Sequence, residues 1–303
     1  MILGHQKQWK FLKRSLEHGR VSHAYLFYGQ QQLGKKTLAL KFAKLLNCEA
    51  DFEKRPCNSC KACNEIKKRR HPDLSIIEPD GGEIKIDQVR DLTELLSKKP
   101  YQGPYKIAVI DQAHLLNHEA ESALLKTVEE PKGNTVLILV TSQKDSLAPT
   151  LISRTQSIEF YPVSRSKIQE FLEEDVDKER AKKIAEVSLG RPGLAKDLTD
   201  SDKFEQYQEK LEQLKKMVKS NYGERFDYIE SLSKSDDLNY TLNLWVSQLR
   251  RILLQQITTG KNEFSYSLEK IKEALQEIQK TKRLINNTNV KKRLALETLM
   301  IKL

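Results

Sequence analysis

The sequence predicts an α/β domain with a mostly parallel sheet, followed by a second half built from helices. Two observations carry this prediction. Short apolar runs alternate with helix-length segments as far as about residue 163, which is typical of a parallel sheet covered by helices on both faces. From residue 204 onward, long amphipathic segments alternate with polar turns and contain no proline, as expected of an all-α region.

The expected strands are short apolar runs, several of them rich in aromatic or β-branched residues, as buried strands should be. They cover residues 24–28, 73–79, 106–112, 135–142 and 157–163. Between them, apolar residues at helical spacing predict helices at 35–47, 86–97 and 116–130. In the second half, the run 242–257 places a continuous stripe on one helix face, which is either domain core or subunit interface: Leu242, Trp245, Leu249, Ile252, Leu253 and Ile257.

Composition narrows the class of protein. The chain has 303 residues, enough for about two or three domains, and a net charge of +10 from 52 Lys and Arg against 42 Asp and Glu. A basic balance suits a partner that bears phosphates, although ordinary helical proteins also carry many charges. No apolar run approaches the ~20 residues of a membrane span, and the first residues lack a signal peptide's apolar core. We therefore expect a cytoplasmic protein with no membrane partner.

The stretch YGQQQLGKKT, residues 28–37, has the spacing of a phosphate-binding loop. Gly29 and Gly34 supply the turn whose backbone N–H groups cradle phosphate, and Lys35 neutralises it. The next residue is Lys36, where a Ser or Thr hydroxyl would hold Mg²⁺. Thr37 offers a hydroxyl one position late, about 100° around the helix. The pattern therefore predicts a degenerate nucleotide site and leaves ATP or ADP binding open.

A second altered position follows the run IAVID. Ligands of parallel sheets sit at the carboxyl ends of strands, so Asp111 is expected near the glycine loop, where an acid orders Mg²⁺ in phosphate-loop enzymes. Gln112 comes next, where many ATP-hydrolysing proteins have a glutamate that activates water. An amide is a far poorer base than a carboxylate. Both the metal and the water positions therefore depart from those of an active ATPase.

All four cysteines lie within 16 residues, in the pattern C-x8-C-x2-C-x2-C formed by Cys48, Cys57, Cys60 and Cys63. In a reducing compartment such a cluster indicates a metal site rather than disulfides. Four thiolates satisfy tetrahedral Zn²⁺ completely and leave no position for water, so the predicted site is structural. Free thiols and an iron–sulfur cluster are the alternatives.

Several motifs in order resemble one family. HAYLFYGQQQLGKKT, the cysteine module, HPDLSIIEPDG, VIDQAH, ALLKTVEEP and LISRTQ are similar to the AAA+ subunits of the bacterial DNA polymerase III clamp loader. The delta-prime type fits better than the gamma/tau type, which has an intact G-K-[ST] and an Asp-Glu pair. The resemblance is dense over residues 22–161, continues through GRPGLA at 190–195 and thins out beyond.

The resemblance implies a subunit in three parts. These are an AAA+ domain at residues 1–163 with its zinc module at 48–63, a small helical lid at 164–202, and a helical collar at 203–303 that joins subunits into a ring. The polar stretch 197–203 is a plausible linker.

The resemblance also assigns residues. Arg154 matches the arginine that faces the ATP site of the adjacent subunit, an arginine finger acting in trans. Arg191 matches a nucleotide sensor of the lid, while Thr141 and Ser142 end the strand that usually carries another sensor. The basic run KKRRH, residues 67–71, is either a DNA-facing patch or, more commonly for such runs, a solvated helix end.

Three functions remain as alternatives. The leading one is a delta-prime-like, largely non-hydrolysing ring component that supplies Arg154 to a neighbouring ATPase while the sliding clamp is loaded onto primed DNA. The implied partners are the gamma/tau and delta subunits, the clamp, and primer-template DNA met through the assembled complex. Polymerase activity, the nucleotidyl transfer of a DNA-directed DNA polymerase, then belongs to the holoenzyme rather than to this chain. One other function is an active gamma/tau-like ATPase in which Thr37 substitutes for the missing hydroxyl and Gln112 suffices. The other is a zinc-containing DNA-binding regulator that uses the basic surface directly.

Overall fold

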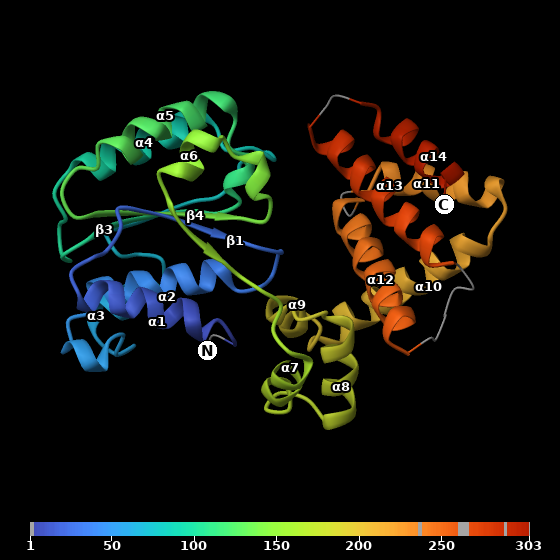
Figure 1. Cartoon of the computed structure of the whole chain (residues 1–303), viewed down its shortest axis with the longest axis horizontal. Coiled ribbons are helices and arrows are strands. Elements are labelled where there is room, and N and C mark those ends of the chain that lie inside the picture. Colours follow the sequence, from blue (N-terminus) through green and yellow to red (C-terminus); the bar gives the residue numbers. More distant parts are fainter. Residues whose placement is uncertain (1–2, 236–237, 260–266, 288–289, 303) are drawn as a thin grey trace. The chain divides into compact units, whose positions relative to one another are not determined.

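A computed structural model describes residues 3–235, 238–259, 267–287 and 290–302 (Figure 1). The chain divides into two compact units. The first runs up to Phe171 and also takes in Gly190–Leu194, and the second holds Leu172–Leu189 and the chain from Ala195 on.

The first unit contains a five-stranded sheet in the order β2-β3-β4-β1-β5. All neighbouring strands pair in parallel, which confirms the expected parallel α/β domain. The strands are β1 (Ala24–Tyr28), β2 (Leu74–Ile77), β3 (Lys106–Ile110), β4 (Thr135–Thr141) and β5 (Gln156–Glu159). The carboxyl ends of these strands therefore meet along one edge of the sheet.

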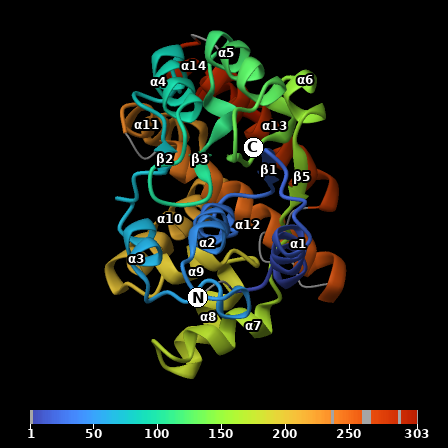
Figure 2. The same ribbon diagram turned by 90° about the vertical axis from the view of Figure 1, so that its left-hand side faces the viewer.

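Helices cover both faces of this sheet. Figures 1 and 2 place α1, α2 and α3 on one face and α4, α5 and α6 on the other. Side chains alternate accordingly along β1, since Tyr25 and Phe27 pack toward α2 whereas Ala24 and Leu26 join the opposite core. The helices are α1 (Gln6–Glu17), α2 (Lys35–Asn47), α3 (Lys61–Lys67), α4 (Ile86–Ser97), α5 (His118–Glu129) and α6 (Pro149–Ser153), with short 3-10 turns at Phe52–Lys54, Ala113–Leu115 and Lys144–Ser146.

Some expected strands are longer than the observed ones. The last strand ends at Glu159, whereas the sequence predicted strand as far as residue 163. Pro162 has no N–H with which to continue the ladder. The N–H of Val163 donates instead to the carbonyl of Gly190, 2.8 Å away. This bond ties the segment before α9 to the first unit.

The rest of the described chain is helical. Its helices are α7 (Arg165–Leu172), α8 (Lys178–Val187), α9 (Pro192–Asp197), α10 (Ser201–Lys219), α11 (Tyr222–Ser233), α12 (Leu238–Thr259), α13 (Leu268–Asn287) and α14 (Lys292–Lys302). The predicted linker at 197–203 was wrong in extent. Only residues 198–200 lie outside helices, because the Asp200 carboxylate caps α10 by accepting from the N–H groups of Asp202 and Lys203.

The stripe on α12 is mainly core. Leu242 and Trp245 are fully buried, and the Trp245 ring stacks against Tyr228 with centroids 6.2 Å apart. Leu249 and Ile252 are also buried, but Ile257 is 62% exposed, so the stripe leaves the core at its end. No helix in the described ranges is long and apolar enough to cross a membrane.

A buried carboxylate fixes the loop between α4 and β3. Asp73 is 1% exposed, and its two oxygens accept hydrogen bonds from the backbone N–H groups of Tyr101, Gln102 and Gly103 at 2.6–2.8 Å. Burial opposes ionisation of Asp73, but these N–H donors outweigh it and lower the pKa of the carboxyl. The loop is thus held to the start of β2 by a charge-assisted network.

We expect Asp73→Asn to lower the free energy of unfolding by about 1–3 kcal/mol at pH 7, because an amide cannot accept all three hydrogen bonds. A carboxyl with a lowered folded pKa contributes stability above its unfolded pKa, and this contribution is lost as pH falls through the folded value. The gap between variant and wild type should therefore narrow below about pH 4. Urea unfolding, monitored by circular dichroism at each pH, measures the difference in unfolding free energy between variant and wild type. The exposed Asp91→Asn is the control. Equal losses in both variants would contradict the network.

Candidate functional site

The glycine loop joins β1 to α2 at the carboxyl edge of the sheet. Gly29 has φ 138°, and a Cβ there would clash with the carbonyl oxygen of Phe160. Gly34 has φ 90° and forms the N-cap of α2. Both positions lie in the left-handed region that favours glycine. The backbone therefore has the strand, turn and helix N-terminus of a phosphate-binding loop.

Lys35 lies inside this loop rather than projecting into solvent. The residue is 6% exposed, and its Nζ donates to the carbonyl of Gly29 at 2.7 Å and to that of Gln30. Burial lowers the pKa of the Lys35 ammonium to about 8, although the negative charge of Asp111 opposes the shift. The group is thus mainly protonated at pH 7 and can neutralise an anion.

Lys36 makes the contact that distinguishes this loop. Its Nζ lies 2.9 Å from Oδ2 of Asp111 and also donates to the carboxylate of Glu78. The side chains of Lys36 and Asp111 are only 23% and 20% exposed. Arg69 adds a second cation at Glu78, 3.4 Å away. The ammonium therefore occupies the space between the first turn of α2 and the acid after β3.

The two residues at the predicted metal and water positions, Thr37 and Gln112, are both exposed. Thr37 is exposed on α2, one position beyond the lysine that reaches Asp111. Gln112 is exposed, has φ 54°, and donates its own N–H to Oδ1 of Asp111 at 3.0 Å. Among the described contacts, Asp111 is thus held by Lys36 and by the backbone of Gln112. A divalent ion does not fit this arrangement, because the hydroxyl ligand is missing and a cation already contacts the acid.

Further polar residues line the same edge. Thr141 ends β4 and is buried, and its hydroxyl lies 3.3 Å from Nδ1 of His114. Burial lowers the pKa of His114, and the charge of Lys35 lowers it further. Thr141, which the resemblance pairs with Ser142 at the position of a sensor, is the last residue of β4. The hydroxyl of Thr141 also donates to the Gln143 carbonyl at 3.2 Å, so contacts to His114 and Gln143 hold this side chain in place.

Two segments that are distant in sequence, one before α1 and one at the start of α9, form hydrogen bonds with the glycine loop. His5, 9% exposed, places its Nε2 2.8 Å from the carbonyl oxygen of Leu33. The N–H of Gly193 donates to the carbonyl of Gln32 at 2.9 Å. This bond brings the start of α9, and with it the half-buried Arg191, beside the glycine loop. The segment of Arg191, which the resemblance assigns to a helical lid, thus lies at the site.

Arg154 lies apart from these contacts, at the C-cap of α6. Its Nε is 2.8 Å from Oε1 of Glu129 at the end of α5, and its Nη1 donates to the Thr150 carbonyl at 3.0 Å. The Arg154 and Glu129 side chains are 41% and 47% exposed. Such exposed ion pairs contribute about 0–1 kcal/mol to the stability of a fold, so this pair holds the guanidinium only weakly.

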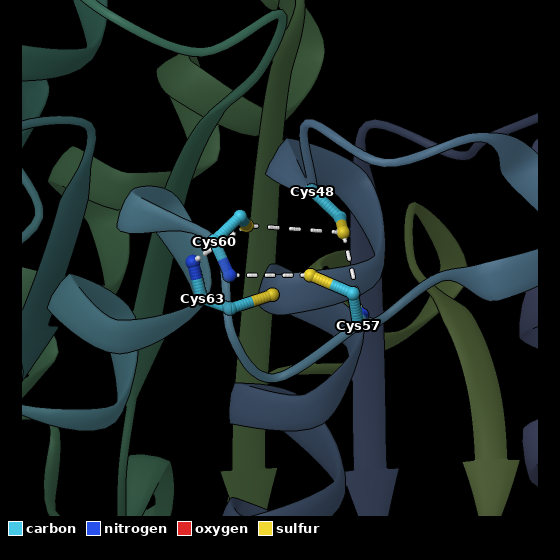
Figure 3. A group of neighbouring side chains, drawn as sticks. All are labelled: Cys48, Cys57, Cys60 and Cys63. Carbon is cyan, nitrogen blue, oxygen red and sulfur yellow. Dashed lines mark hydrogen bonds between the residues drawn. The ribbon is translucent and has the colours of Figure 1, made fainter.

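The four cysteines come together beyond the end of α2 (Figure 3). Cys48 follows α2, Cys60 is the N-cap of α3, and Cys63 lies within α3. All four sulfur atoms lie within 4.8 Å of one another. Zn–S bonds of 2.3 Å in a tetrahedron place sulfurs about 3.8 Å apart, so a small contraction would complete the sphere. The donor set therefore fits a structural zinc ion.

Backbone N–H groups point at three of these sulfurs. Cys48 Sγ accepts from the N–H of Cys57, Cys57 Sγ from Cys60, and Cys60 Sγ from Cys63, at 3.3–3.4 Å. Hydrogen bonds, led by those from Ser59, lower the pKa of Cys57 to about 6, whereas burial raises the pKa of Cys63. N–H donors stabilise thiolates, which are the form that binds metal.

Sequence analysis missed two contributors to the site. Glu78 follows β2 at the same edge at which Asp111 follows β3, so the carboxyl-end rule could have found it. His5 precedes α1, which was not predicted, and no sequence signal links it to the loop. The fold and the loop together define a phosphate-loop type of α/β protein whose metal-holding positions are altered.

Comparison with known proteins identifies the family. A sequence profile described as DNA polymerase III, delta subunit, matches residues 4–164. DNA polymerase III subunit delta′ of Bacillus subtilis is 35% identical over 73% of this chain and 67% of its own length. The delta′ subunit of Pseudomonas aeruginosa is 34% identical over 71% and 66%. The chain thus spans about two thirds of each relative, and it belongs to the family of delta-prime subunits of the DNA polymerase III clamp loader.

Related subunits match over a shorter stretch. DNA polymerase III subunit tau of Escherichia coli is 33% identical over 59% of this chain and 28% of its own length. The crystal structure of a gamma subunit-related protein from Thermotoga maritima covers 97% of both chains at a TM-score of 0.46 and 19% identity, a likeness too weak to carry an argument.

We expect the purified chain to contain one Zn²⁺, and Cys60→Ala to lose it, because the variant removes one of the four ligands. Zinc contributes ~10–16 kcal/mol to small isolated modules, but this module hangs from a five-stranded core that should stay folded. Metal analysis and circular dichroism measure the two effects, with exposed Lys61→Ala as the matched control. A wild-type chain that holds no zinc in reducing, chelator-free buffer would refute the assignment.

Proposed function

We propose that this chain is a largely non-hydrolysing ring subunit of the clamp loader, which lends Arg154 to the ATP site of a neighbouring subunit while the sliding clamp is loaded onto primed DNA. The observation that carries the proposal is the side chain of Lys36, which points to Asp111 where an active ATPase would place a hydroxyl and Mg²⁺.

Water activation is impaired for a separate reason. Gln112 replaces the usual glutamate, and its side chain is exposed after a left-handed backbone turn. An amide can orient a water molecule but accepts a proton poorly. The two defects act on different parts of the reaction, so they should compound.

Arg154 has the properties that an in-trans role requires. Its side chain is 41% exposed, and its contacts to Glu129 and Thr150 hold it at a helix end without burying it. A planar guanidinium can pair with two γ-phosphate oxygens and stabilise the charge that develops there during transfer. Exchange of a weak ion pair for a phosphate contact costs little.

In the proposed function the chain works within a hetero-oligomeric ring. Partners are gamma/tau and delta subunits, whose complex meets the clamp and primer-template DNA in the cytoplasm. Residues 1–163 form the AAA+ domain with its structural zinc module, residues 164–202 the lid, and residues 203–303 the collar that joins the ring. The match to both delta′ and tau relatives supports placement in such a complex.

We expect negligible ATP turnover by the purified chain. Lys36→Ser combined with Gln112→Glu restores a hydroxyl and a carboxylate, and should recover nucleotide binding before it recovers turnover. Steady-state phosphate release and fluorescent-nucleotide titration measure the two properties. Turnover by the wild-type chain at 1 s⁻¹ or more, roughly the lower end for enzymes, that is lost in Lys35→Ala would favour the active-ATPase alternative.

Arg154→Ala should lower the DNA- and clamp-stimulated ATPase of the assembled complex. An arginine finger typically raises the hydrolysis rate at a single site by ~10³–10⁵-fold. A ring with several ATP sites will show a smaller loss of total ATPase activity. Folding, zinc content and ring assembly should stay unchanged, because the ion pair is exposed.

Glu129→Gln is the matched control, since it removes the ion pair and keeps the guanidinium. If Arg154 acts on a neighbouring site, Glu129→Gln retains activity and Arg154→Lys loses it, because an ammonium lacks the planar fork. Equal effects of Arg154→Ala and Glu129→Gln would mean that the pair is structural only.

A further inference from the structure

The carboxyl edge of the sheet holds a cation that belongs to the chain itself. Lys36 Nζ contacts two carboxylates from different strand ends, Asp111 after β3 and Glu78 after β2. The Lys36 side chain is 23% exposed, whereas the lysines that pair with a glutamate three or four residues away on one helix are 47–72% exposed. The contacts of Lys36 instead link α2 to the ends of two strands, β2 and β3.

The position of the ammonium matters as much as its contacts. Lys36 follows the loop lysine at the start of α2, and Asp111 follows the buried strand β3. In phosphate-loop proteins a hydroxyl and an acid at these two places hold Mg²⁺ between them. Here Lys36 stands in place of the residue with the hydroxyl, and its ammonium also contacts Asp111. Its charge lies where the metal ion would otherwise lie.

Charge balance argues against a metal ion in addition. Lys35, Lys36 and Arg69 surround the two carboxylates, so the cluster already has more positive than negative charges. A divalent ion at Asp111 would have to displace Lys36 or sit beside it, and like charges at such distances repel. The hydrogen bond from Lys36 also lowers the pKa of Glu78, so that carboxylate stays ionised and paired.

We propose that the Lys36 ammonium is a built-in replacement for the divalent cation, which holds the cation position at Asp111 and Glu78 and keeps Mg²⁺ out of it. This rests on the proposed function, since it explains how the loop keeps its shape without metal chemistry. A phosphate group that enters the loop meets two lysine ammoniums and no metal ion at this position.

The test is the binding of Mn²⁺, a stand-in for Mg²⁺, to the full zinc-loaded chain, counted by electron paramagnetic resonance without nucleotide or partner subunits. In the wild-type background, Asp111→Asn should leave the Mn²⁺ isotherm unchanged. Lys36→Ser should gain one site that binds at least about tenfold tighter than any in the wild type, since removal of one adjacent charge is worth about that factor. Lys36→Ser with Asp111→Asn should lose that site.

Lys44→Ser is the control for net charge, because it removes a lysine from the same helix at a distance from the two acids. Wild-type Mn²⁺ binding that Asp111→Asn abolishes would overturn the proposal, and so would a folded Lys36→Ser chain with no new site. The comparison of wild type with Asp111→Asn decides the matter even if Lys36→Ser does not fold. The outcome is independent of Arg154, so failure here and failure of the proposed ring function are distinguishable.

Discussion

The contact between the Lys36 ammonium and the Asp111 carboxylate, 2.9 Å apart, governs what the carboxyl edge of the sheet can do. It joins the first turn of α2 to the end of β3 and places a fixed positive charge beside the acid. A protonated lysine cannot ligate a metal ion. The backbone cradle formed by Gly29 and Gly34 therefore remains without the ligand pair that phosphate-loop enzymes use. The chain keeps the shape of a nucleotide site, with a lysine of its own beside the acid.

Under the proposed function, the chain serves ATP chemistry through its surface rather than through its own loop. Arg154 stands on a short helix outside the loop, exposed and held by one ion pair and one carbonyl. The sheet that positions α6 is the same sheet that positions the loop, so the proposed role of Arg154 would use the nucleotide-binding architecture even though the site itself is altered. The cysteine module extends from the other end of α2 and is separate from both features.

Much of the fold could be predicted from sequence because it depends on local patterns. The parallel sheet, α2, and the place of Asp111 follow from apolar periodicity and from the rule that ligands gather at strand ends. The partners of Lys36 could not be predicted, because lysine reach and rotamer are set by residues 42 and 75 positions away. The stripe on α12 was identified, but only tertiary packing decides that Trp245 is buried and Ile257 exposed.

The most direct test of the account is the DNA- and clamp-stimulated ATPase of a complex assembled from gamma/tau and delta subunits with this chain carrying Lys35→Ala. Zinc content and ring assembly serve as checks that the variant is folded. If the chain acts on a neighbour's ATP site and not through its own loop, the complex should hydrolyse ATP at the wild-type rate. A complex that loses a share of its turnover when Lys35 is removed would contradict the account, because the loop would then be a working site.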